Sequence, residues 1–167
     1  GKRAFHEMLP TRTHSLEAGR IYRKISYGPM LDVFMLDLRS YRGPNTDGDQ
    51  IELDDQSSVL GATQMAWFKQ TLMESQATWK VIASDMPIGL VIWDDYRSSS
   101  GVEGIANGIK GAPLGRELEL AGLLRSLKQH DVKNTLWITA DVHYTAAHHY
   151  HPDRAAFKEF LPFWEFV

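Results

Sequence analysis

The residue types best suited to metal chemistry lie close together, in the segment Leu136 to His143. A short apolar run, Leu136 to Ala140, leads directly into Asp141 and His143, with one residue between them. The run is too short for a helix and rich in bulky side chains, so it predicts a buried β-strand. A carboxylate and an imidazole at the end of such a strand suit a catalytic metal that keeps positions open for water or substrate. Asp141 and His143 are therefore our first candidates for the functional chemistry.

The Asp-x-His pattern also has a purely structural interpretation. Asp141 could cap the end of the strand, and His143 could satisfy a backbone carbonyl. Three more histidines follow at His148, His149 and His151, so four of the seven histidines fall within nine residues. This clustering favours a functional interpretation, but a polar surface loop with incidental metal affinity would have the same composition.

The elements that would position these residues follow from the hydrophobic periodicity of the chain. Strands are predicted over residues 20–27, 31–38, 79–84 and 134–140, and helices over 61–75 and 115–129. Residues 1–19 are predicted to be irregular. The run Val33 to Leu36 is apolar on both faces, which predicts a strand that is covered on both sides. Alternating helices and strands indicate a layered α/β architecture, in which ligands bind beyond the carboxyl ends of the strands.

A long segment rich in glycine and serine, Asp94 to Pro113, separates two of these elements. We predict a structureless loop that is mobile without ligand and that influences substrate choice, because long loops of this kind are usually lids or binding loops. The segment contains neither the Gly-Lys-Ser/Thr of a phosphate-binding loop nor a Gly-x-Ser-x-Gly nucleophile motif.

The predicted strand over residues 31–38 ends at Asp37 and Leu38, and Arg39 and Arg42 follow it. The two arginines could bind a phosphate through paired hydrogen bonds. The alternative is an ion pair between Asp37 and Arg39 that closes the end of the strand.

Composition excludes several classes of function. The net charge of −3 and the absence of any Lys/Arg run predict no nucleic-acid-binding patch. The longest apolar stretch, Ile88 to Trp93, is far shorter than the ~18 residues that a membrane span requires. Because the chain has no cysteine, it contains no disulfide, no thiolate ligand and no cysteine nucleophile.

Several segments together resemble the alkaline phosphatase D (PhoD-like) branch of the calcineurin-like metallophosphatases. They occur in the family's order and span nearly the whole chain, at residues 20–23, 36–42, 60–64, 77–82, 113–117, 139–148 and 162–167. The resemblance implies a sandwich of two β-sheets flanked by helices, with a metal centre at the strand ends. It implies that Asp141 and His143 are metal ligands. Many members have glycine where this chain has Ala140, which matters only if the position needs a positive φ.

The resemblance also implies roles for residues around the metal centre. His148 could donate a proton to the leaving group or to a phosphate oxygen, or it could have a structural role next to the metal ligands. Arg39 could bind phosphate. His149 and His151 are weaker candidates, because near relatives tend to have other residues there. The implied cofactors are divalent or trivalent metal ions, with iron and calcium used in the family.

We therefore expect residues 1–167 to be the C-terminal half of a PhoD-like catalytic domain, a single domain that is incomplete. The parent protein is expected to hydrolyse phosphate mono- or diesters, with a periplasmic or secreted location implied by the family. The chain alone is expected to be inactive, because the remainder of the parent chain would supply the other metal ligands. One alternative is a nucleotidase or phospholipase-like phosphodiesterase on the same scaffold. Another is a non-catalytic metal- or phosphate-binding module that retains the fold.

Overall fold

The structure is a computed structural model that describes residues 1–167. A six-stranded sheet, a small two-stranded sheet and three α-helices make up the regular structure. The large sheet consists of β1 (Arg23–Tyr27), β2 (Leu31–Met35), β3 (Trp79–Ala83), β6 (Thr135–Ile138), β7 (Ala147–Tyr150) and β8 (Phe163–Phe166). The small sheet consists of β4 (Trp93–Asp95) and β5 (Ser100–Val102). The helices are α1 (Lys2–Met8), α2 (Gly61–Glu74) and α3 (Glu117–Gln129), and a 3₁₀ turn, η1, covers Pro152–Arg154.

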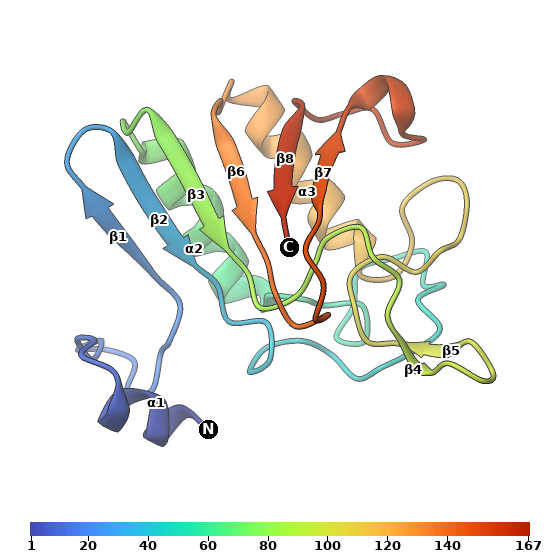
Figure 1. Ribbon diagram of the computed structural model, residues 1–167, viewed down its shortest axis with the longest axis horizontal. Coiled ribbons are helices and arrows are strands. Elements are labelled where there is room, and N and C mark those ends of the chain that lie inside the picture. The colour runs from blue at the N-terminus through green and yellow to red at the C-terminus, as the bar shows by residue number, and fades with distance from the viewer.

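The large sheet has the strand order β1-β2-β3-β6-β8-β7. Its four central strands are parallel, and the two outer strands, β1 and β7, are antiparallel to their neighbours. The carboxyl ends of the parallel strands consequently meet at one edge, which is the lower edge of the sheet in Figure 1. This is the edge at which open α/β sheets bind their ligands.

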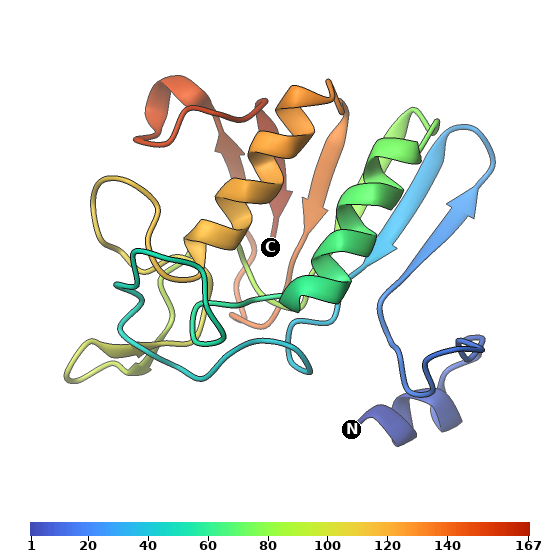
Figure 2. The same cartoon turned by 180° about the vertical axis from the view of Figure 1, so that it is seen from behind.

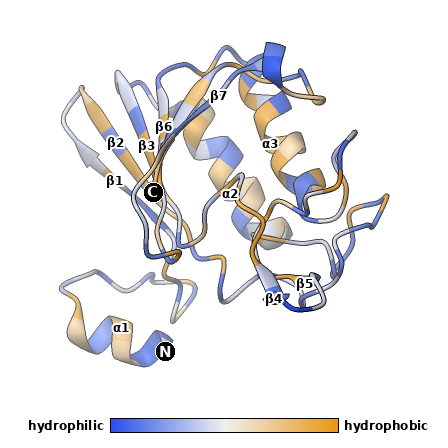
Figure 3. Cartoon of the chain, turned by 45° about the vertical axis from the view of Figure 1, so that its right-hand side comes forward, coloured by the Kyte–Doolittle hydropathy of each residue, from blue (hydrophilic) through white to orange (hydrophobic).

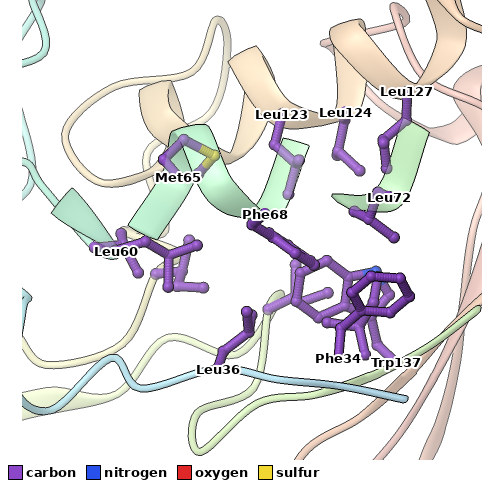
Figure 4. Packing of buried hydrophobic residues seen from close by; sticks show 14 of the residues in the cluster. Phe34, Leu36, Leu60, Met65, Phe68, Leu72, Leu123, Leu124, Leu127 and Trp137 are labelled. Atoms are coloured by element: carbon purple, nitrogen blue, oxygen red, sulfur yellow. The ribbon is translucent and has the colours of Figure 1, made fainter. Parts of the chain in front are cut away.

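Helices α2 and α3 cover the same face of the sheet, behind it in Figure 1 and in front of it in Figure 2. Hydrophobic and hydrophilic residues alternate along both helices, as expected for helices with one buried side (Figure 3). Between the layers, Phe68 of α2 packs against Phe34 of β2 and Trp137 of β6, with ring centroids 6.0 and 6.3 Å apart. Leucines of α3, including Leu123, pack into the same core next to α2 (Figure 4).

The opposite face of the large sheet carries apolar side chains that no helix covers. Strand alternation places on it a set of half-buried or exposed residues, among them Val33, Met35, Val81, Ile138, Trp164 and Phe166. The prediction that the run Val33 to Leu36 is covered on both sides is therefore correct only for the side that carries Phe34.

The predicted strands and the two long helices are present, with boundaries shifted by a few residues. The strand before Asp141 ends at Ile138, so Thr139 and Ala140 already belong to the turn that follows. Residues 1–19 are not entirely irregular, because α1 forms there, although none of its residues is buried. None of the helices has the length and apolar character required to cross a lipid bilayer.

The segment Asp94 to Pro113 is not structureless. The β4–β5 hairpin occupies its first part, where Trp93 pairs with Val102. The guanidinium group of Arg116, which is 4% exposed, donates hydrogen bonds of 2.7–3.0 Å to the backbone carbonyls of Val102, Glu103 and Gly104. The second half of this segment is thereby fixed to the start of α3.

Candidate active site

Acidic, basic and histidine side chains that follow three neighbouring strands lie at the carboxyl edge of the large sheet. Asp37 and Arg39 follow β2, Asp85 follows β3, and Asp141 and His143 follow β6. Because β2, β3 and β6 are adjacent and parallel, the segments that follow them run along the same edge (Figure 1). The sequence predicted that Asp141 and His143 lie at the carboxyl end of a strand. In the structure they follow β6, at the same edge as the residues that follow β2 and β3.

Asp141 and His143 are exposed, and neither side chain makes a hydrogen bond or ion pair within the chain. Both backbones lie in the left-handed region, with φ of 80° and 56°. Aspartate and histidine are among the residues found there most often, but such conformations cost on the order of 1–3 kcal/mol and cluster at functional sites. Ala140, where many relatives have glycine, does not have a positive φ. Neither the strand-cap role for Asp141 nor the carbonyl-satisfying role for His143 is seen in the structure.

Asp85 and Asp37 organise the backbone after β2. The carboxylate of Asp85 accepts hydrogen bonds from the backbone N–H groups of Leu38 and Arg39, each at 3.2 Å. Asp37 is buried; its Oδ1 accepts from the N–H of Ser40 at 3.0 Å, and its Oδ2 has no partner. Gln64 of α2 donates to the carbonyl of Asp37 and accepts from its N–H. These contacts fix the turn that presents Arg39.

The expected ion pair between Asp37 and Arg39 does not form. Instead, Arg39 Nη1 pairs with Glu103 Oε1 at 2.8 Å, and Arg42 Nη2 approaches the same oxygen at 3.4 Å. Glu103 comes from the segment after β5, whereas Asp37 is buried and contacts the backbone N–H of Ser40 instead of an arginine. The side chain of Arg39 stays 53% exposed, and such an exposed pair contributes at most about 1 kcal/mol. A phosphate oxygen could therefore replace Glu103 at little cost.

His148 meets a buried glutamate that the sequence analysis did not single out. Its Nδ1 lies 3.1 Å from Oε2 of Glu165, whose side chain is 0% exposed. Tyr150 donates its hydroxyl to the same oxygen at 2.6 Å. Burial, and then the hydrogen bond to Glu165, raise the pKa of Tyr150 far above its usual value, so its hydroxyl remains a donor. A Cβ on Gly89 would overlap this hydroxyl, so only glycine fits at that position.

The four clustered histidines do not form one group, and the surface-loop interpretation of the cluster is wrong. Residues 147–150 form β7, so adjacent side chains point to opposite faces of the sheet. His149 consequently stacks on Trp164, with ring centroids 4.6 Å apart, on the face that lacks helices. His151 instead caps η1, where its Nδ1 accepts from the N–H of Asp153.

Three residues were missed in the sequence, although two of them carried a usable signal. Asp85 follows a predicted strand in the same way as Asp141 does, which could have placed it at the same edge. Glu165 is the single charged residue in the apolar strand β8, and a charge between aromatic residues indicates a specific partner. Glu103 had no signal, because its role depends on how the long loop folds back.

The donor types present suit a metal ion, but their number does not complete a site. Asp141 and His143 supply an oxygen and a nitrogen donor that no other group engages. Hard cations require about six such donors. The chain contains no group of three or more His, Asp or Glu residues placed to hold a metal. Any metal at this edge would need further ligands beyond Asp141 and His143.

The fold places the chain in a known class of α/β proteins. A solved structure described as PhoD superposes with a TM-score of 0.68 over 99% of this chain and 32% of that one, at 23% sequence identity. At that identity the likeness shows a shared fold.

Sequence comparison gives the family. The whole chain, residues 1–167, matches the model of the PhoD-like phosphatases, and the chain belongs to this family. It is 30% identical over 159 residues to alkaline phosphatase D of Bacillus subtilis (strain 168), which covers 90% of this chain and 26% of the relative. The chain thus spans about a quarter of the length of this curated relative.

Proposed function

We propose that the protein containing this chain is a metal-dependent hydrolase of phosphate mono- or diesters, with Asp141 and His143 as metal ligands. The observation that carries the proposal is the turn after β6. It holds a carboxylate and an imidazole, both exposed and without partners, on two backbones with positive φ. Strained residues that make no contacts of their own are typical of sites that bind a ligand.

A metal ion bound there would polarise the phosphoryl group and lower the pKa of a bound water. The residues around it have separate roles. Arg39, held by the backbone contacts of Asp85, would exchange Glu103 for a phosphate oxygen and orient the ester. His148 is the second residue of β7, which begins at the same edge, and would exchange a proton with the substrate or with water.

The test is the pair of variants Asp141→Asn and His143→Ala in the intact protein. An amide is a poorer ligand than a carboxylate and alanine is none, so both variants should lose bound metal and lower turnover by orders of magnitude. Circular dichroism should show that both remain folded, because neither side chain contacts the rest of the chain. His149→Ala is the matched control, since His149 lies on the other face of the sheet.

Metal content and turnover at the level of the unmodified protein in both variants would refute the ligand assignment. Metal binding without turnover of any mono- or diester would instead favour the non-catalytic binding module.

A further inference from the structure

The carboxylate of Glu165 has four hydrogen-bond partners within the chain. None of these partners is Asp141, His143 or Arg39. Besides His148 and Tyr150, Glu165 accepts from the backbone N–H of Ile88 at 2.7 Å and from the hydroxyl of Thr139 at 2.9 Å. Ile88 lies three residues after Asp85, and Thr139 lies two residues before Asp141. One buried side chain therefore joins the segments that follow β3 and β6 to strand β7.

The hydrogen bonds of Glu165 define which nitrogen of His148 carries the proton. The N–H of Ile88 and the hydroxyl of Thr139 both donate to Oε1. Oε2 receives the hydroxyl of Tyr150 and faces Nδ1 of His148. Both oxygens of Glu165 already accept hydrogen bonds from other groups, so we assign the carboxylate as the acceptor in this contact too and Nδ1 as the donor. Four donors around one carboxylate are the arrangement that makes a buried charge tolerable.

The other ring nitrogen of His148 is free. Nε2 has no hydrogen-bond partner in the chain, and the side chain is 29% exposed. In the neutral ring, a proton on Nδ1 leaves a lone pair on Nε2. Nε2 is then an acceptor at the carboxyl edge of the sheet.

We infer that Glu165 is a positioning residue for His148. Its buried carboxylate keeps the proton of His148 on Nδ1, and Nε2 is therefore the nitrogen that accepts a proton from the substrate or from water. This inference rests on the proposed function, and it gives His148 a defined role in the reaction. Nε2 takes a proton from a water as that water attacks phosphorus, and the resulting imidazolium then passes the proton to solvent. The leaving oxygen departs from the opposite side of phosphorus and receives its proton from solvent. In Ser-His-Asp hydrolases, a buried carboxylate likewise accepts from Nδ1–H of a histidine and leaves Nε2 free to accept a proton. The sequence-based expectation for His148 was proton donation or a structural role, and the inferred tautomer adds proton acceptance to these.

The tautomer can be observed directly by ¹⁵N NMR of the intact protein labelled on histidine, with His148→Gln used to assign the signal. We expect Nδ1 of His148 to resonate as a protonated nitrogen and Nε2 as an unprotonated one. In Glu165→Gln, the amide N–H₂ group would face Nδ1 and donate to it, so the proton should move to Nε2. His149, which stacks on Trp164 and does not contact Glu165, should keep its spectrum in this variant.

Activity gives the second measurement. Glu165→Gln should lower kcat about 10- to 100-fold, as loss of a positioning partner does, with KM changed much less. Tyr150→Phe also removes a hydrogen bond from Oε2 but should leave the tautomer of His148 unchanged, which separates positioning from general support of the fold. If Glu165→Gln does not fold, the spectra of the unmodified protein and of Tyr150→Phe still decide.

Protonation of His148 at Nε2 in the unmodified protein would overturn the inference, as would an unchanged tautomer in folded Glu165→Gln. Failure of the proposed function would look different: the expected tautomer would be present, with no turnover of any phosphate ester.

Discussion

Arg116 offers the sharpest test of how the candidate site is held in place. Its guanidinium group donates to three carbonyls after β5 and, through Nη2, to the carbonyls of Gly43 and Pro44 at 2.9 and 2.8 Å. It therefore joins the loop that precedes α2 to the segment that carries Glu103, at the start of α3. No carboxylate contacts it, and burial lowers the pKa of Arg116 to about 10.

The substitution Arg116→Met keeps an unbranched, flexible apolar side chain, although a shorter one, and removes every donor. Two of the lost bonds, to Val102 and Gly104, are fully buried. A hydrogen bond from a charged donor contributes about 1.5–3 kcal/mol, so these two alone give a loss of about 3–6 kcal/mol. Removing a buried charge offsets part of this loss, and we expect the free energy of unfolding to fall by about 3 kcal/mol.

Urea denaturation of the intact protein measures the change. Arg116→Lys should lie between the variant and the unmodified protein, since an ammonium group keeps the charge but offers three donors instead of five. Arg125→Met is the matched control on the same helix, because its ion pair with Glu159 is exposed on both sides and contributes at most about 1 kcal/mol. A loss below about 1 kcal/mol in Arg116→Met would show that the carbonyls find other donors and that Arg116 does not hold the two loops together.

Two further predictions concern buried polar groups. Tyr150→Phe leaves Oε2 of Glu165 with one donor fewer and should lower the free energy of unfolding, measured by urea denaturation, by about 1.5–3 kcal/mol. A loss below about 0.5 kcal/mol, which is typical of an exposed contact, would contradict this prediction. Burial raises the pKa of Glu119 above its ordinary 4.5, so the folded state binds its proton more tightly and stability falls as pH rises through that range. Glu119→Gln should therefore be more stable than the unmodified protein at pH 7, and its advantage should shrink on acidification; a constant difference from pH 7 to pH 4 would contradict the assignment.

The layered fold could be predicted from sequence because its signals are local. Phe68 and its neighbours at helical spacing identify α2, and the bulky run before Asp141 identifies β6. Predicting alternating helices and strands was enough to expect Asp141 and His143 at the carboxyl end of a strand, where open α/β sheets bind ligands. The resemblance to the PhoD-like family added a specific function to that location.

What could not be predicted depends on contacts between segments far apart in the sequence. Glu103 and Arg39 are 64 residues apart, and no periodicity indicates that they pair. The contact between Glu165 and Ile88 spans 77 residues. The strand β7 was missed because its sequence, Ala-His-His-Tyr, lacks the bulky apolar residues that identify a strand. Its pairing with β8 determines its conformation.

The left-handed backbones of Asp141 and His143 have a consequence for how substitutions at these positions would be ranked. Glycine adopts a positive φ without steric cost, so exchanging either residue for glycine relieves strain while removing a side chain that stabilises nothing in this chain. A screen that selects only for thermal resistance should therefore favour glycine at both positions, whereas a screen for turnover should reject it. Opposed rankings of this kind identify places where a protein retains a residue at the expense of its own stability.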